Sequence, residues 1–153
     1  MELDRLDLAI LETLQRNGRA TAAELGDAAG LSASPSHRRQ KLLEEGGVIQ
    51  RYVALLDQEK VGLPINVFVS VKLADHTDET LRGFERAIEA CAEVMEMYEM
   101  SGAADYLMRV VAADVASYEA FLRGRLTKIP GVKSFESSLA LKRLVYRTHL
   151  PLR

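Results

Sequence analysis

The hydrophobic pattern of the chain changes near residue 60. Before that point apolar residues recur every three or four positions, which is the spacing of one buried helix face. After it, several segments alternate between apolar and polar residues, as strands with one buried face do, and helical segments lie between them. Gly62-Leu63-Pro64 interrupts both patterns. The sequence therefore predicts two domains, residues 1–60 and residues 64–153.

The first domain is predicted to contain three helices, at residues 4–16, 22–29 and about 32–45. Thr21 with Glu24 three positions later is a capping box that begins the second helix. Gly30 ends that helix, and Ser32 or Ser34 caps the third. Residues 48–53 follow as a short apolar segment that is open to a strand interpretation. A helix, a tight turn with glycine and a second, basic helix indicate a helix-turn-helix.

The third predicted helix carries side chains suited to reading DNA. Small or hydrogen-bonding residues at the start of a recognition helix fit the major groove, and basic residues neutralise phosphates or pair with guanine edges. A basic helix face that is merely solvated is the alternative interpretation. The predicted DNA-contacting set comprises three serines, a histidine and three basic residues: Ser32, Ser34, Ser36, His37, Arg38, Arg39 and Lys41.

The second domain is predicted to follow the order β-α-β-β-α-β, the split ferredoxin-like unit. Its strands are expected at residues 65–73, 94–101, 106–112 and 132–141. One helix begins within residues 75–78, and Asp114 caps the other, which extends to Leu126. Two helices on one sheet face leave the other face as a surface for dimerisation. The hydrophobic pattern does not decide which face holds Val67, Val69, Met95 and Met97. The predicted fold class is α+β.

Composition narrows the possible functions. The chain has 153 residues, 48% of them apolar and 27% charged, with a net charge of -2. The single Cys91 excludes an internal disulfide and is predicted to be a small core residue, while the scattered His37, His76 and His149 indicate no metal site. The sequence has no phosphate-binding glycine loop, no paired zinc-ligand motif and no Gly-x-Ser-x-Gly elbow, so no cofactor is expected. Apolar runs are too short to span a membrane, and no export signal is evident, so a cytoplasmic location is expected.

Together the two predicted domains resemble the Lrp/AsnC family of bacterial and archaeal transcription regulators, over essentially the whole chain. In the first domain the resemblance rests on Leu3-Asp4, Asp7, Ile10-Leu11, Leu14-Gln15, Gly18-Arg19, Glu24-Leu25, Gly30-Leu31-Ser32, Pro35, Arg38-Arg39, Leu43-Glu44 and Gly47-Val48-Ile49. In the second it rests on Ser101-Gly102, Asp105-Tyr106-Leu107, Arg109-Val110, Tyr118, Leu126, Pro130-Gly131-Val132, Ser137-Ser138 and Leu150-Pro151-Leu152.

The resemblance implies a winged or plain helix-turn-helix joined to a ligand-sensing RAM domain. It further implies binding to double-stranded DNA, homodimers that commonly assemble into octamers or related rings, and amino acids or related effectors bound between dimers. The family's ligand motif matches Gly102, Ala103, Ala104, Asp105 and Tyr106. A glycine lets a ligand approach backbone amides, and a carboxylate can hold an ammonium group. Ser137 is a further candidate effector contact. Capping of a local turn by Asp105, and ordinary strand exposure of Ser137, are the alternatives.

Three departures from the family pattern affect the candidate sites. Gln40 stands where relatives usually carry an apolar residue, and Leu42 where a basic one is common, so the base-contacting set is open. Ala103-Ala104 replaces a bulkier, more polar turn.

The predicted function is a non-enzymatic DNA-binding transcription regulator with an amino-acid-like effector. The alternative is an enzyme of the same architecture, such as a tetrapyrrole decarboxylase, for which His37, His76 and His149 are the candidate histidines.

Overall fold

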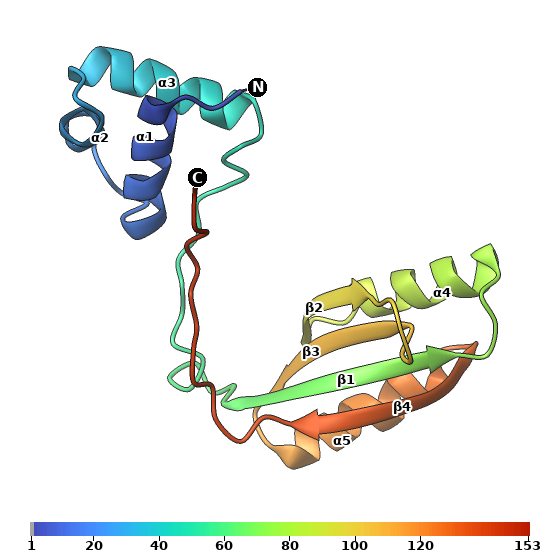
Figure 1. The fold of residues 1–153 in the computed structure, drawn as a ribbon. Helices are drawn as coiled ribbons and strands as arrows, with labels where there is room; N and C mark the ends of the chain where they lie inside the picture. The colour runs from blue at the N-terminus through green and yellow to red at the C-terminus, as the bar shows by residue number, and fades with distance from the viewer. Residues whose placement is uncertain (1) are drawn as a thin grey trace. The chain divides into compact units, whose positions relative to one another are not determined.

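The computed structural model describes residues 2–153, and its contacts divide the chain into two compact units (Figure 1). The first unit comprises the residues up to Leu55 together with Leu144–Arg153, and the second is Leu56–Arg143. The last ten residues thus belong with the first unit, although the sequence pattern groups them with residues 64–153.

The first unit contains three helices, α1 (Arg5–Arg16), α2 (Ala22–Ala29) and α3 (Ala33–Glu45), close to the predicted bounds. Capping boxes begin α1 and α2, and Gly30 ends α2 in the left-handed conformation at φ 69°. The core between these helices consists of Ile10, Leu11, Leu14, Leu25, Ala29 and Leu43.

The first unit closes with the C-terminal segment. The Gln15 side chain donates to the Leu150 carbonyl at 3.1 Å and accepts from the Leu150 amide at 2.5 Å. Leu152 packs against the core of the three helices. The strand interpretation of residues 48–53 is wrong, since no strand lies between Gly46 and Pro64 in the described chain. A lone apolar segment with no partner strand has nothing to pair with.

The second unit is a four-stranded antiparallel sheet with two helices. Along the chain it consists of β1 (Ile65–Leu73), α4 (Asp78–Glu89), β2 (Val94–Glu99), β3 (Tyr106–Ala112), α5 (Val115–Gly124), a short 3-10 helix (Leu126–Lys128) and β4 (Val132–Leu139). The strand order is β2-β3-β1-β4, which confirms the predicted β-α-β-β-α-β unit. β2 and β4 are two residues shorter than predicted. The second helix ends at Gly124, although Leu126 is buried as its periodicity predicts.

Helices α4 and α5 cover the same sheet face (Figure 1). Val67 and Val69 are buried on this face against Phe84 and Phe121. Met97 lies opposite Met108 and therefore belongs to this face as well. Cys91 is buried in the same core, as predicted. Burial raises the pKa of its thiol.

Among the described residues of the second unit, no helix covers the other sheet face. Phe68 of β1 lies opposite Arg109 of β3 and is 41% exposed. Arg109 donates to Glu96 at 3.0 and 3.1 Å and to Asn66 at 3.0 Å, so a polar cluster crosses three strands. Tyr98 of β2 is also exposed on this side. None of the described helices is long and apolar enough to cross a membrane.

Candidate functional site

One side of α3 is open to solvent. Leu43 anchors the helix in the core of the first unit, while Ser34, His37, Arg38 and Lys41 are all exposed. Residues three and four positions apart share a helix face, so these four side chains form one continuous exposed surface, which we call the α3 stripe. Ser32, the residue preceding the helix, is exposed and its side chain makes no capping hydrogen bond.

Ser36 does not belong to the α3 stripe, although its place in the sequence predicts a DNA contact. The residue is fully buried, and its hydroxyl donates to the Ser32 carbonyl at 2.9 Å. A Cβ atom at Gly26 would lie 3.1 Å from the Ser36 hydroxyl and 2.5 Å from the Leu31 carbonyl oxygen. Helices α2 and α3 therefore approach closely at Gly26, and only a small side chain fits at position 36.

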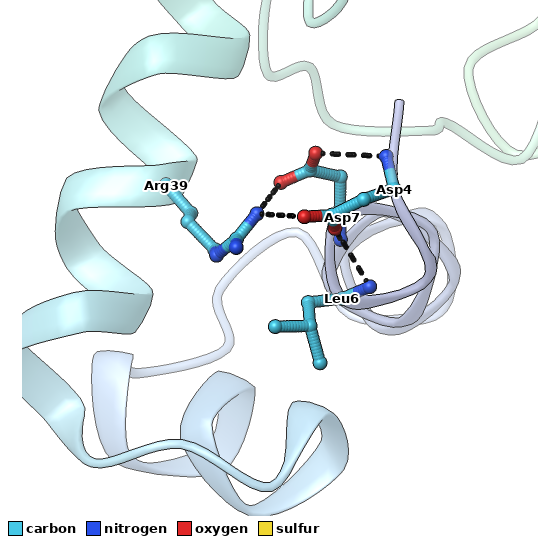
Figure 2. Close-up of polar contacts among 4 residues, drawn as sticks. All are labelled: Asp4, Leu6, Asp7 and Arg39. Carbon is cyan, nitrogen blue, oxygen red and sulfur yellow. Dashed lines mark hydrogen bonds and ion pairs between the residues drawn. The ribbon is translucent and has the colours of Figure 1, made fainter. Parts of the chain in front are cut away.

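Arg39 is held by two carboxylates at the start of α1 (Figure 2). Its Nη1 atom lies 2.7 Å from Oδ1 of Asp7 and 2.8 Å from Oδ2 of Asp4. The side chain of Asp4 also accepts from the amides of Leu6 and Asp7, and Asp7 accepts from the amide of Asp4. Arg39 is predicted from the sequence to contact DNA, but in the structure its guanidinium joins α3 to the first turn of α1.

The electrostatics of this ion pair agree with its geometry. The amide of Asp7, and after it the Arg39 guanidinium, lower the pKa of the Asp4 carboxyl. The hydrogen bonds to Asp7 and Asp4 in turn raise the pKa of Arg39. Only 28% of the Arg39 side chain and 12% of the Asp7 side chain are exposed. The pair is thus partly shielded from water, and breaking it would leave a carboxylate with a poor alternative partner.

Gln40 has a structural reason for being polar. Its amide donates to the Tyr52 hydroxyl at 2.9 Å and to the Glu44 carboxylate at 3.2 Å, and Tyr52 donates to Glu44 at 2.8 Å. This triangle attaches the segment after α3 to the helix. Burial, together with the Glu44 charge, raises the pKa of Tyr52, although the hydrogen bond from Gln40 acts in the opposite direction.

The second candidate site is the turn between β2 and β3. The Met100 amide donates to the Asp105 carbonyl at 2.8 Å, which closes the turn, and the Asp105 amide donates to Val71 at 2.9 Å. Gly102 has φ +133°, which side chains rarely adopt. Within residues 2–153, no hydrogen bond engages the amides of residues 102–104. The turn therefore presents backbone donors that a ligand can use.

The Asp105 carboxylate at the end of this turn already has two partners. Its Oδ2 atom accepts from the Leu73 amide at 2.7 Å, and its Oδ1 atom lies 2.7 Å from Nε2 of His76. The hydrogen bond from His76, followed by the Leu73 amide, lowers the pKa of Asp105, and the charge of Lys72 acts in the same direction. The group is therefore a well-oriented carboxylate. Sequence reasoning did not connect His76 to this turn.

Tyr106 and Ser137 are engaged within the second unit. Tyr106 is 2% exposed, its hydroxyl donates to Glu85 of α4 at 2.8 Å, and its ring packs against Phe84. Burial, with the hydrogen bond to Glu85, raises the pKa of Tyr106. Ser137 is hydrogen-bonded to the Tyr118 hydroxyl of α5 at 2.5 Å. Tyr106 therefore acts as a core residue behind the turn, which differs from its predicted contact with an effector.

A cavity of about 450 Å³ lies between α4 and β2. It is lined by apolar side chains and three glutamates: Glu85, Ile88, Glu89, Val94, Met95, Glu96 and Met97. Glu85 is the acceptor of the Tyr106 hydroxyl, but no residue of the Gly102 turn lines the cavity.

The three histidines lie on separate elements. His37 is in α3, His76 follows β1, and His149 is in the C-terminal segment. Across residues 2–153, no three histidine, cysteine or acidic side chains gather as a metal site.

A helix-turn-helix with an exposed basic stripe, followed by a ferredoxin-like unit, defines a class of DNA-binding proteins that carry a separate ligand-binding domain. Residues 3–50 match the family described as winged helix-turn-helix DNA-binding, and residues 66–150 match the Lrp/AsnC ligand binding domain. The chain therefore belongs to the Lrp/AsnC family and is a DNA-binding transcription regulator of that type. Nothing in these matches favours the enzymatic alternative.

Similar proteins match over nearly the whole chain. The Bkd operon transcriptional regulator of Pseudomonas aeruginosa is 45% identical, over 99% of each chain. The crystal structure of an AsnC family transcriptional regulator from Agrobacterium tumefaciens has a TM-score of 0.93 at 43% identity and covers 97% of each chain. The transcriptional regulator NMB0573 from Neisseria meningitidis, in complex with L-Met, has a TM-score of 0.93 at 35% identity, covering 98% of this chain and 97% of its own.

Proposed function

We propose that the α3 stripe reads operator DNA. The observation that carries this proposal is the periodic exposure of Ser34, His37, Arg38 and Lys41 on a helix whose other side is packed. The serine and histidine side chains are suited to base edges, and the two cations to phosphates or guanine. Ser32, which is also exposed, joins this set at the helix start. The buried Ser36 and the ion-paired Arg39 are left out of it.

The proposed mechanism needs two copies of the chain. Two recognition helices of a dimer contact half-sites about one helical turn, or a multiple of it, apart on the same face of the duplex. The uncovered sheet face, with Phe68 and Tyr98 exposed beside the Arg109 cluster, is the surface we propose for pairing with a second copy. Assembly of dimers into octamers is part of the same proposal. Sedimentation of the wild type and of Phe68→Glu tests it, and an unchanged oligomer in the variant would contradict pairing through this face.

DNA binding can be tested by fluorescence anisotropy with a labelled fragment of the chain's own promoter region. Lys41→Ala is expected to weaken binding and to reduce the slope of log K against log salt by about 1, because one phosphate contact is lost. Arg82→Ala is the matched control, since Arg82 is also an exposed cation and lies on α4 of the other unit. If Lys41→Ala and Arg82→Ala behave alike, or no binding occurs below micromolar protein at low salt, the proposal fails.

We also propose that the Gly102 turn binds a free amino acid. The amides of residues 102–104 are donors for the carboxylate of such a ligand, and Asp105 is an acceptor for its ammonium group. A turn that offers backbone donors beside an acidic group complements a zwitterion. The L-Met complex of the Neisseria meningitidis relative supports an amino acid as the effector class. Ser137, bonded to Tyr118, has only a secondary place in this proposal.

The effector proposal is tested by a thermal-shift screen of the twenty proteinogenic amino acids, beginning with L-methionine. A true effector at a hundred times its Kd stabilises the folded chain by about 2.7 kcal/mol. Asp105→Asn is expected to abolish the shift, because the ammonium loses its counter-charge. Effector binding must also change DNA affinity, and DNA must change effector affinity by the same factor. A shift that survives in Asp105→Asn would move the effector to another site.

A further inference from the structure

The carboxylate proposed to hold the effector is not free in this chain. Asp105 Oδ2 is taken by the backbone amide of Leu73, and Oδ1 by the imidazole of His76. The two partners differ in kind. The amide belongs to the last residue of β1 and is fixed by the sheet, whereas the His76 side chain is 65% exposed. Of the two, only the imidazole can leave without disturbing a strand.

The surroundings of the contact allow such an exchange. Lys72 adds positive charge near Asp105, and Asp75 adds negative charge beside His76. The Asp75 carboxylate is occupied in capping Thr77, whose amide and hydroxyl both donate to it. Within residues 2–153, Asp105 is the one hydrogen-bond partner of the His76 ring. The His76 side chain is 65% exposed, so water can solvate the ring when it leaves the Asp105 carboxylate, whose side chain is 17% exposed.

We propose that His76 is an internal competitor for the effector ammonium, displaced from Oδ1 of Asp105 when an amino acid binds. This inference rests on the effector role proposed above for Asp105. The ammonium group then takes the place of the imidazole at Oδ1, while the Leu73 amide keeps the carboxylate oriented. Ligands that lack an amino group gain nothing from displacing the imidazole, so His76 favours amines over other small acids.

The displacement also has a structural consequence within the second unit. His76 lies in the connection between β1 and α4, one residue before Thr77, whose hydroxyl caps α4. Release of the imidazole unties this connection from the turn between β2 and β3. Effector binding is thereby communicated to the start of α4.

The experiment compares amino-acid affinities by calorimetry in full-length wild type, His76→Ala, His76→Arg and Asp105→Asn. The probes are the twenty proteinogenic amino acids, with L-methionine first. Removing the competitor is expected to tighten binding about two- to fivefold, because a contact made by a mostly exposed side chain is weak. The permanently charged arginine is expected to weaken binding. His149→Ala is the control, because that histidine lies in the C-terminal segment of the first unit.

A second readout follows the His76 imidazole itself. Its ring resonances are expected to shift when the wild type is saturated with the amino acid, because the ring exchanges Asp105 for water. Equal affinities in wild type and His76→Ala, or ring resonances that stay in place on saturation, overturn the competitor role. If binding is then still lost in Asp105→Asn, the effector proposal stands without it. If no amino acid binds either the wild type or His76→Ala, both proposals fail.

Discussion

The two candidate sites hold their charged residues in opposite ways. At α3, the Arg39 guanidinium is clasped by Asp4 and Asp7 and is mostly shielded from water. At the Gly102 turn, Asp105 is held by an imidazole that is largely exposed. The first contact is part of how the three helices pack, whereas the second can separate into solvent at small cost. A polar contact near a candidate site can therefore either stabilise the packing of helices or occupy a group that a ligand needs. The exposure of the donor side chain distinguishes the two cases.

The largest effect is expected at Ser36, which lies in the packing of the first unit. Ser36→Leu inserts a large side chain where α2 and α3 meet at Gly26, and overpacking of this kind costs about 1–3 kcal/mol or more. Loss of amide hydrogen-exchange protection in α3, with β1 and β3 still protected, is the expected result. Ser34→Leu on the exposed side of the same helix is the control. Equal protection of α3 in both variants would show that position 36 is not confined.

Arg38 and Arg39, adjacent in sequence, are expected to have different effects on DNA. Arg38→Ala should weaken operator binding by about 1–3 kcal/mol if it pairs with a base and lower the salt slope by about 1 if it contacts a phosphate. Arg39→Ala should leave the salt slope as in wild type, because its charge is already paired within the protein. Anisotropy titrations at several salt concentrations measure both. A reduced slope in Arg39→Ala would place that guanidinium at the DNA.

The same two variants should reverse their order in stability. Arg39→Ala is expected to destabilise the first unit by about 1–2 kcal/mol, since charge-assisted hydrogen bonds to Asp7 and Asp4 are lost. Arg38→Ala, at an exposed position, should stay within about 0.5 kcal/mol of wild type. Chemical denaturation followed by helix circular dichroism measures the difference. Indistinguishable midpoints for the two variants would mean that the Arg39 ion pair does not stabilise the first unit.

Acid should reduce the difference in stability between wild type and Arg39→Ala. The pKa of Asp4 is lower in the folded chain than its usual value, so its stabilising contribution is complete above about pH 4 and is lost as the pH falls through the lowered pKa. The stability gap between wild type and Arg39→Ala should therefore narrow below about pH 4. Denaturation midpoints at a series of pH values record it. A gap that stays constant into the acid range would mean that the Asp4 carboxylate contributes nothing to holding Arg39.

The smallest effect on stability is expected at the contact between His76 and Asp105. His76→Ala should change the free energy of unfolding by less than about 0.5 kcal/mol, because the ring is mostly exposed and Leu73 continues to bind Asp105. Thermal unfolding of the ligand-free variant checks this. A destabilisation as large as that of Arg39→Ala would make the His76 contact a structural one and end the contrast between the two sites.

Local periodicity predicted the elements well. The predicted strands at residues 65–73 and 106–112 have the bounds of β1 and β3. In β1 the side chains alternate between the buried core and the other sheet face, as its sequence pattern predicts, whereas the last three residues of β3 are all buried. The helix starts at Thr21 and Asp114 follow from capping side chains within three residues. Both kinds of signal lie within a few positions of the residues they describe.

The contacts that define the candidate sites depend on longer range. Arg39 and Asp7 are 32 positions apart, and His76 and Asp105 are 29 apart, so no local pattern pairs them. Ser36 is polar and lies among exposed residues, and its burial follows from the close approach of α3 to Gly26. Sequence alone therefore proposes which residues are chemically suited to a ligand. It does not reveal which of them the fold has already engaged.

The return of the C-terminal segment to the first unit affects how truncations should be interpreted. Leu150 and Leu152 complete contacts of the three-helix unit, although the family match for the ligand-binding domain extends to residue 150. A shortened chain lacking these residues would lose DNA affinity because the three-helix unit would be less stable. A genetic screen would misinterpret that defect as a loss of effector binding. By the same reasoning, an excised fragment of residues 1–60 lacks a piece of its own hydrophobic interior.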